Sequence, residues 1–138
     1  MRKVLFLCIG NSCRSQMAEG WLRHLAGDRF EAHSAGVMPC YVNEDAIRVM
    51  SELGIDISQQ RSKHVSEYDG QHFPFVITVC DPARTSCPVF AGETHREHWP
   101  VEDPGMFNGP DEHRLAVFRE TRDEIGERVR GFIEKSGR

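Results

Sequence analysis

The sequence lacks the features that would place it in several specialised classes of protein. No apolar run approaches the ~20 residues that a membrane-spanning helix needs, so we expect no membrane contact. Basic residues do not outnumber acidic ones, and the formal net charge of -4 argues against a nucleic-acid-binding surface. The opening segment MRKVLFLCIG has too short an apolar run for a secretory signal, and no small-residue cleavage site follows it. We therefore expect a cytoplasmic protein.

Internal repeats, linkers and low-complexity tracts are also absent. The length of 138 residues predicts a single domain over residues 1–138, which we expect to be a monomer. The five cysteines form an odd number, whereas secreted disulfide scaffolds favour even numbers in shorter chains. Several thiols in a cytoplasmic protein indicate metal, catalytic or redox chemistry, and their spacing has to distinguish these possibilities.

Segments typical of strands alternate with segments typical of helices. The predicted strands are Val4–Cys8, Arg29–Ser34, Phe75–Cys80 and Thr94–His98. Apolar residues at helical spacing predict helices over Ser15 to Gly27, over Asn43 to Gly54, and from Asp111 onward. The last helix would bury a stripe of Leu115, Phe118, Arg122, Ile125, Val129 and Phe132. This alternation predicts an α/β, flavodoxin-like fold, with a four-stranded parallel sheet flanked by helices on both faces.

The segment from Cys8 to Arg14 links the first strand to the first helix, at the sheet edge where ligands bind in such folds. Gly10 permits unusual backbone angles, and the loop N–H groups together with the helix start favour an anion. The guanidinium of Arg14 matches two oxygens of a tetrahedral oxyanion. Cys8 would be a thiolate nucleophile, to which Ser15 donates a hydrogen bond. A packing cysteine followed by a solvated arginine is the alternative. We expect the oxyanion to be bound by Ile9, Gly10, Asn11, Ser12, Cys13 and Arg14.

Cys80 and Cys87 form a second pair within VCDPARTSCP. If the segment is helical, the two cysteines, seven positions apart, are separated by about 10 Å along the axis. A disulfide needs alpha carbons within about 7 Å, so the segment would have to unwind before the two could join. A structural zinc site is one alternative, although the spacing lacks the tight knuckle typical of such sites. Two unrelated thiols are the other alternative.

The segment CIGNSCRSQMAEG resembles the phosphate-binding loop of the low-molecular-weight protein tyrosine phosphatases. It is more similar still to that of the thioredoxin-coupled arsenate reductases, which share the fold. The likeness continues through SAG at Ser34–Gly36, GIDIS at Gly54–Ser58, the Cys80 and Cys87 pair, REHWPVEDP at Arg96–Pro104 and RDEIGERV at Arg122–Val129. It covers nearly the whole chain and implies the low-molecular-weight phosphatase type of fold.

The resemblance implies that the chain reduces arsenate to arsenite without a tightly bound cofactor. Cys8 would attack arsenate, Cys80 would attack Cys8 and release arsenite, and Cys87 would attack Cys80. Thioredoxin, as a transient partner, would reduce the final disulfide. One alternative is a phosphatase that acts on phosphotyrosine or other aryl phosphates through a Cys8 phosphocysteine. A non-enzymatic sensor of oxyanions or of oxidation is the other.

The reaction needs a proton donor, and two Asp-Pro pairs compete for this role. Asp81 directly follows Cys80, where its charge would hinder formation of a thiolate. Asp103 is expected in the loop after the fourth strand, and it matches the general acid of the families that the chain resembles. We therefore assign the role to Asp103. In GMFNG, the segment after Asp103 and Pro104, Phe107 is the only aromatic residue, which argues against a tyrosine phosphatase.

Asn11, Glu19 and Ser34 match positions that bind potassium behind the loop in some arsenate reductases. The fourth ligand there is an aspartate, whereas this chain has Lys63, and an ammonium group cannot ligate a cation. We therefore expect no metal and assign the first three residues to support of the loop. Lys63 would either lie on the surface or place its ammonium close to Glu19.

Overall fold

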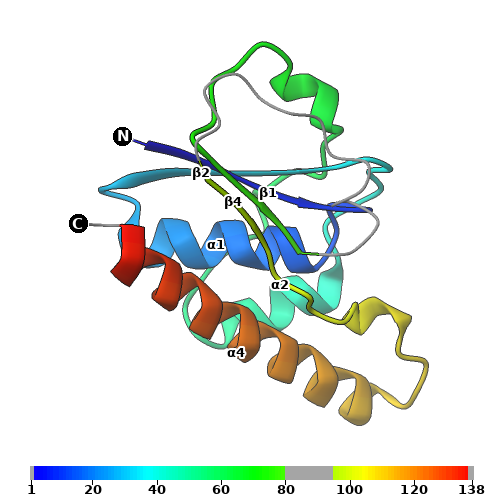
Figure 1. Cartoon of the computed structure of the whole chain (residues 1–138). Coiled ribbons are helices and arrows are strands. Elements are labelled where there is room, and N and C mark those ends of the chain that lie inside the picture. The colour runs from blue at the N-terminus through cyan, green and yellow to red at the C-terminus, as the bar shows by residue number, and fades with distance from the viewer. Residues whose placement is uncertain (1, 80–94, 137–138) are drawn as a thin grey trace.

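The computed structural model describes residues 2–79 and 95–136, and its framework is one four-stranded sheet (Figure 1). The strands are β1 (Arg2–Cys8), β2 (Phe30–Gly36), β3 (Phe75–Thr78) and β4 (His95–His98), in the spatial order β2-β1-β3-β4. All neighbouring strands are parallel. The predicted flavodoxin-like parallel sheet is therefore confirmed, with small differences at the strand ends.

Three α-helices of the described chain gather on one face of the sheet, and a single-turn helix lies over the other face (Figure 1). The three are α1 (Arg14–Ala26), α2 (Glu44–Ser51) and α4 (Asp111–Ser136), and the single turn is η1 (Val65–Tyr68). A second single turn, η2 (Pro104–Met106), follows β4. Within the described ranges, no helix is long and apolar enough to span a bilayer.

The core fills the space between the sheet and this helical layer, and Val65 and Tyr68 of η1 add buried side chains on the other face. β1 is buried from Val4 to Cys8, as expected for a central parallel strand. The predicted stripe of α4 is confirmed: Phe118, Arg122, Ile125, Val129 and Phe132 are buried, and Leu115 packs partly buried against the core. The buried arginine is satisfied by the carbonyl oxygen of Val49 (2.8 Å) and a carboxylate oxygen of Glu52 (2.9 Å). The positive charge of Arg122 is therefore paired with a carboxylate, while the aliphatic part of its side chain packs in the core.

The carboxyl ends of β1 and β3 lie side by side and define the edge at which the loops meet. Leu7 pairs with Thr78, and the next residue, Val79, donates its N–H to the carbonyl oxygen of Leu7 (2.8 Å). β4 extends this edge, because Thr78 also pairs with His98. The loops that follow β1 and β4 therefore emerge at the same end of the sheet.

Asn43 caps α2, as the sequence predicts. Its Oδ1 accepts hydrogen bonds from the N–H groups of Asp45 (2.8 Å) and Ala46 (3.1 Å). Asn43→Ala removes both bonds and should lower the free energy of unfolding by about 1 kcal/mol, measured by urea denaturation. Asn43→Ser keeps a capping oxygen and is the matched control. Equal losses in the two variants would show that the cap contributes nothing.

Candidate active site

The loop from Cys8 to Arg14 closes against the end of β2. Asn11 has a φ of 48°, in the left-handed region that asparagine tolerates better than most residues. Gly36 lies directly behind the loop. A Cβ on Gly36 would lie 2.6 Å from the carbonyl oxygen of Ile9 and 2.8 Å from the backbone nitrogen of Asn11. No side chain fits in that space, which accounts for the glycine of the SAG motif.

Cys8 is the last residue of β1, and only 2% of it is exposed. Its Sγ lies 2.8 Å from the Oγ of Ser15 and accepts a hydrogen bond from the N–H of Asn11 (3.2 Å). The Oγ of Ser15 itself accepts a hydrogen bond from the Nδ2 of Asn11 (2.8 Å), which leaves its hydroxyl hydrogen to point at the sulfur. The sulfur of Cys8 therefore has two hydrogen-bond donors directed at it, one from a side chain and one from the backbone.

Arg14 begins α1, with its guanidinium buried beside the loop. Its Nη1 donates to the carbonyl oxygens of Val101 (3.0 Å) and Val79 (3.4 Å), and its Nη2 lies 3.6 Å from the Oδ2 of Asp103. The Nε is buried and has no hydrogen-bond partner in the described part of the chain. A buried donor without a partner carries a desolvation penalty, which an oxyanion would remove by accepting its hydrogen.

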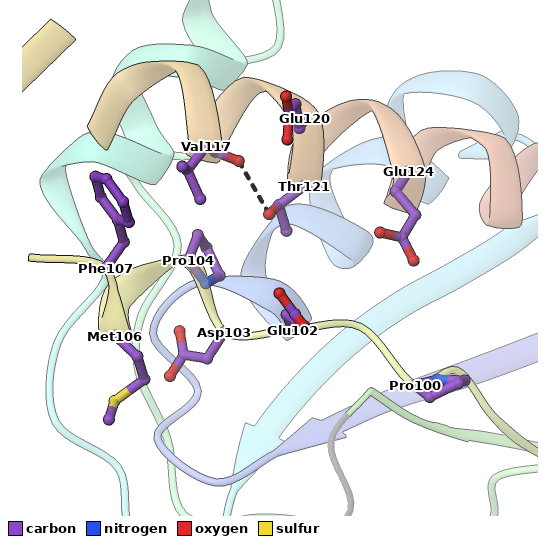
Figure 2. A pocket seen from close by; sticks show the side chains of 10 residues that line it. All are labelled: Pro100, Glu102, Asp103, Pro104, Met106, Phe107, Val117, Glu120, Thr121 and Glu124. Atoms are coloured by element: carbon purple, nitrogen blue, oxygen red, sulfur yellow. Dashed lines mark hydrogen bonds between the residues drawn. The ribbon is translucent and has the colours of Figure 1, made fainter. Parts of the chain in front are cut away.

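Asp103 precedes Pro104 at the start of η2. Its Oδ1 accepts a hydrogen bond from the N–H of Gly105 (2.9 Å), which fixes the carboxyl group. Figure 2 shows Pro104 turned toward α4 and the Asp103 side chain turned away from that helix. The Oδ2 is therefore presented to Arg14, and Asp103 shares a cavity with Cys8.

Asp103 also lies in the wall between two cavities. The first, of about 350 Å³, is lined by Cys8, Ile9, Gly10, Ser12, Cys13, Arg14, Cys40, Tyr41, Asn43, Asp103, Gly105 and Met106; we call it the oxyanion cavity. The second, of about 470 Å³, lies between η2 and α4, and its lining includes Glu102, Glu120 and Glu124 (Figure 2). Carboxylates repel an anion, whereas Arg14 attracts one, so the first cavity suits an anion better than the second.

The mouth of the oxyanion cavity has an aromatic ring that the sequence analysis did not identify. Tyr41, in the loop between β2 and α2, lines the cavity and is 63% exposed. Phe107, the aromatic residue expected near Asp103, instead lines the second cavity, the one between η2 and α4. Tyr41 was missed because it is far from Asp103 in the sequence and follows no motif.

Cys13 is in the loop but is a different kind of thiol from Cys8. It is 6% exposed, and burial is the main cause that raises its pKa to about 12. The nearby carboxylate of Asp103 adds to the shift. Cys13 is therefore protonated at neutral pH, and it contributes packing to the loop rather than an anionic sulfur.

The amide oxygen of Asn11 is fully used behind the loop. Its Oδ1 accepts hydrogen bonds from the N–H of Lys63 (2.9 Å) and from the Nε2 of Gln16 (2.9 Å), and its Nδ2 donates to Ser15 (2.8 Å). The oxygen that would ligate a potassium ion is thus already engaged by two donors. Asn11 instead joins the loop to the segment that carries Lys63.

Glu19 is likewise surrounded by protein donors. Its carboxylate accepts from the Oγ of Ser34 (2.5 Å) and pairs with Arg23 (2.5 Å). The side chain of Lys63 is only 10% exposed, and its Nζ lies 3.9 Å from the Oε1 of Glu19. Burial lowers the pKa of Lys63, an effect that the charge of Glu19 opposes. Of the two places considered for Lys63, the structure has the one beside Glu19, so these residues do not fit a potassium ion.

In residues 2–79 and 95–136, no three His, Cys, Asp or Glu side chains lie close enough together to hold a metal ion.

We predict that the melting temperature of the protein is the same in KCl and in NaCl of equal ionic strength, because Lys63 supplies the local positive charge. Lys63→Asp restores a carboxylate and should make the melting temperature higher in KCl. A potassium-dependent rise in the wild-type protein would contradict this assignment.

Cys80, Asp81 and Cys87 lie outside the described residues, so the second thiol pair stays a prediction. The other assigned residues come together from distant parts of the chain. Cys8, Arg14 and Asp103 line the oxyanion cavity. Ser15 does not line it, but hydrogen-bonds to the sulfur of Cys8. Asn11, Glu19 and Ser34 lie behind the loop as a supporting layer rather than in contact with that cavity.

Residues 3–138 match the family described as low molecular weight phosphotyrosine protein phosphatase. An arsenate reductase of Halalkalibacterium halodurans is 45% identical over 131 residues, which covers 95% of this chain and 94% of the relative. The solved structure of an arsenate reductase in the phosphate-binding state is 36% identical, with a TM-score of 0.79 and 98% of each chain covered.

A thioredoxin-dependent arsenate reductase of Corynebacterium glutamicum also has a similar structure, with a TM-score of 0.78 at 29% identity. That match covers 98% of this chain and 61% of the longer neighbour. The similarity to these proteins extends over the loop, the sheet and the long C-terminal helix. The chain therefore belongs to the low molecular weight phosphotyrosine protein phosphatase family, within which it groups with the arsenate reductases.

Proposed function

We propose that this protein is an arsenate reductase that forms a covalent adduct on Cys8 and receives its electrons from thioredoxin. The observation that carries most weight is the buried Nε of Arg14, which has no partner among the described residues. Arg14 lines the cavity that Cys8 also lines, so a bound oxyanion would meet a donor and a nucleophile together. The similarity to arsenate reductases supports arsenate as the oxyanion.

In the first step, arsenate binds to the loop N–H groups and to the guanidinium of Arg14. The thiolate of Cys8 attacks arsenic and forms a sulfur–arsenic bond, and one arsenate oxygen leaves as water. Asp103 supplies the proton that this leaving group requires. Its position supports the role, because Gly105 holds one carboxyl oxygen and the other faces Arg14.

In the following steps, electrons pass from thiols to arsenic. Cys80 attacks the sulfur of Cys8, and the electron pair of the sulfur–arsenic bond stays on arsenic. Arsenic(V) becomes arsenic(III) while two thiols become the Cys8–Cys80 disulfide, so the two electrons balance. Cys87 then attacks Cys80 and frees Cys8, and the two thiols of thioredoxin reduce the Cys80–Cys87 disulfide. A cytoplasmic location suits this chemistry, because its thiols are kept reduced.

A coupled assay tests the proposal. Arsenate, thioredoxin, thioredoxin reductase and NADPH should together give continuous, arsenate-dependent oxidation of NADPH. Omission of thioredoxin is the control and should stop turnover, as should replacement of arsenate by phosphate. A protein that binds phosphate but gives no turnover in the complete mixture would disprove the reductase while leaving the oxyanion site intact.

A phosphatase is the second candidate, favoured by the family match and by the ring of Tyr41 at the cavity mouth. The same attack by Cys8 on a phosphate ester would give a phosphocysteine that water hydrolyses. Hydrolysis of p-nitrophenyl phosphate tests for it, with Tyr41→Ser as the variant that removes the ring. A rise in KM with unchanged kcat would show that the ring binds an aryl group.

Asp103→Asn should slow arsenate reduction by roughly 10²–10⁴-fold, since an amide keeps the shape of the side chain but donates no proton of suitable acidity. The decrease should lie in kcat, because binding depends on the loop and on Arg14. Asp81→Asn is the matched control, an identical change in the competing Asp-Pro pair, and should have much less effect. A larger loss in Asp81→Asn would transfer the role to that residue.

A further inference from the structure

A line of five hydrogen bonds connects the protein surface to the sulfur of Cys8. In order, the donors and acceptors are Arg23 Nη1 to Gln60 Oε1 (2.8 Å), Gln60 Nε2 to Gln16 Oε1 (2.7 Å), Gln16 Nε2 to Asn11 Oδ1 (2.9 Å), Asn11 Nδ2 to Ser15 Oγ (2.8 Å), and Ser15 Oγ to Cys8 Sγ (2.8 Å). Each donor points toward the sulfur. The line starts at a guanidinium, which stays charged at every accessible pH.

The orientation of both glutamines is fixed by partners that can only donate or only accept. The Oε1 of Gln60 faces the guanidinium of Arg23, so its Nε2 must face Gln16. The Nε2 of Gln16 faces the backbone carbonyl oxygens of Asn11 (3.0 Å) and Arg61 (3.1 Å), which only accept. Neither amide can be turned over without placing two acceptors or two donors in contact.

The same reasoning fixes the last two links. The Oδ1 of Asn11 faces the backbone N–H of Lys63 (2.9 Å), a group that only donates, so its Nδ2 must face Ser15. Ser15 and Asn11 are fully buried, as is Gln16, and water does not compete at these links. The hydroxyl of Ser15, having accepted from Asn11, is left to donate to Cys8.

We propose that Gln60 and Gln16 are positioning residues for the nucleophile, and that the aligned amides hold the hydroxyl of Ser15 on the sulfur and favour its thiolate. An amide that accepts a hydrogen bond at its oxygen becomes a better donor at its nitrogen, so aligned links strengthen one another. Arg23 polarises the first link. The inference depends on the proposed function only through the role of Cys8, and it involves neither arsenate nor thioredoxin.

Other charged groups surround this line and are left unchanged in the Gln60 test. Glu19 and Lys63 flank it behind the loop, where Glu19 also pairs with Arg23. Arg14 and Asp103 face the loop from the cavity side. A substitution at Gln60 therefore alters the amide line without removing any of these charges.

The test compares Gln60→Leu and Gln60→Glu with the wild-type protein. Gln60→Leu removes both hydrogen bonds of residue 60 in the line. Gln60→Glu still accepts a hydrogen bond from Arg23, but its carboxylate has no hydrogen to donate to Gln16. Alkylation of Cys8 by iodoacetamide, followed by peptide mass mapping on the acidic limb of its pH dependence, should slow about two- to fivefold in both variants. The dissociation constant for inorganic phosphate, measured by calorimetry, should be unchanged, because the loop donors and Arg14 are untouched.

Gln59→Glu is the matched control: the neighbouring glutamine is exposed and outside the line, so it should alkylate at the wild-type rate. Arg23→Met removes the half-exposed first donor, together with its ion pair to Glu19, and should slow alkylation in the same direction even if the Gln60 variants fail to fold. Wild-type rates in the Gln60 variants, or in Arg23→Met should those variants not fold, would overturn the inference. So would parallel losses of alkylation rate and phosphate affinity, which would mean that Gln60 only maintains the shape of the loop.

Discussion

Cys8→Ser should abolish arsenate reduction, and any phosphatase activity with it, by at least about 10⁴-fold. A serine hydroxyl is not ionised near neutral pH, so the first attack fails, and an oxygen cannot take part in disulfide exchange. The N–H groups of the loop and the guanidinium of Arg14 are untouched. Phosphate should therefore bind with nearly unchanged affinity, which calorimetry can measure on the same sample.

Arg14→Lys provides the contrasting variant. A lysine keeps the positive charge but replaces the planar, two-pronged guanidinium by a point charge. It also lacks the Nε–H group that would donate a hydrogen bond to the oxyanion. We expect this variant to lose phosphate affinity as well as turnover, whereas Cys8→Ser loses turnover alone. Appreciable turnover by Cys8→Ser would exclude Cys8 as the nucleophile.

Cys87→Ala should release one arsenite per enzyme molecule and then stop. In the proposed relay, Cys80 can still attack the adduct on Cys8, but no thiol is left to move the disulfide outward. Rapid-quench measurement of arsenite should therefore show a single burst, with no steady-state rate in the presence of thioredoxin. Peptide mapping of the stalled protein should recover a Cys8–Cys80 disulfide.

Cys80→Ala is the matched control for this experiment. It should release no arsenite at all, because the adduct on Cys8 then has no internal attacker. Phosphatase turnover requires Cys8, Arg14 and Asp103 only, so any such activity should survive in both variants. Repeated turnover by Cys87→Ala with thioredoxin would disprove the three-cysteine relay.

Much of the fold and the centre of the site could be predicted because the signals are local. The apolar run that ends at Cys8, the six-residue interval to Arg14 and the helix that follows are contiguous in the sequence. Parallel strand order then brings the loops after β1 and β4 to one edge, so the sequence alone predicts that Asp103 lies near Cys8.

The groups that could not be predicted act across long sequence separations. Gln60 hydrogen-bonds to Gln16 over 44 residues, and neither glutamine belongs to a pattern with a chemical meaning of its own. Lys63 could not be assigned to the interior or the surface, because burial of a lysine depends on a partner such as Glu19 that folding has to bring close. Tyr41 reaches the cavity mouth for a similar reason, through a loop that no motif describes.

The protonated state of Cys13 has a consequence for how oxidation is routed through the protein. Disulfide exchange needs an attacking thiolate, and burial raises the pKa of Cys13 to about 12, so this thiol stays protonated at pH 7. Cys13 is the thiol nearest to Cys8 along the chain and lines the same cavity, but it reacts too slowly to attack Cys8. An adduct or oxidised sulfur on Cys8 is left for a faster thiolate from another segment. The protonated state of Cys13 therefore protects the loop against an unproductive disulfide between Cys8 and Cys13.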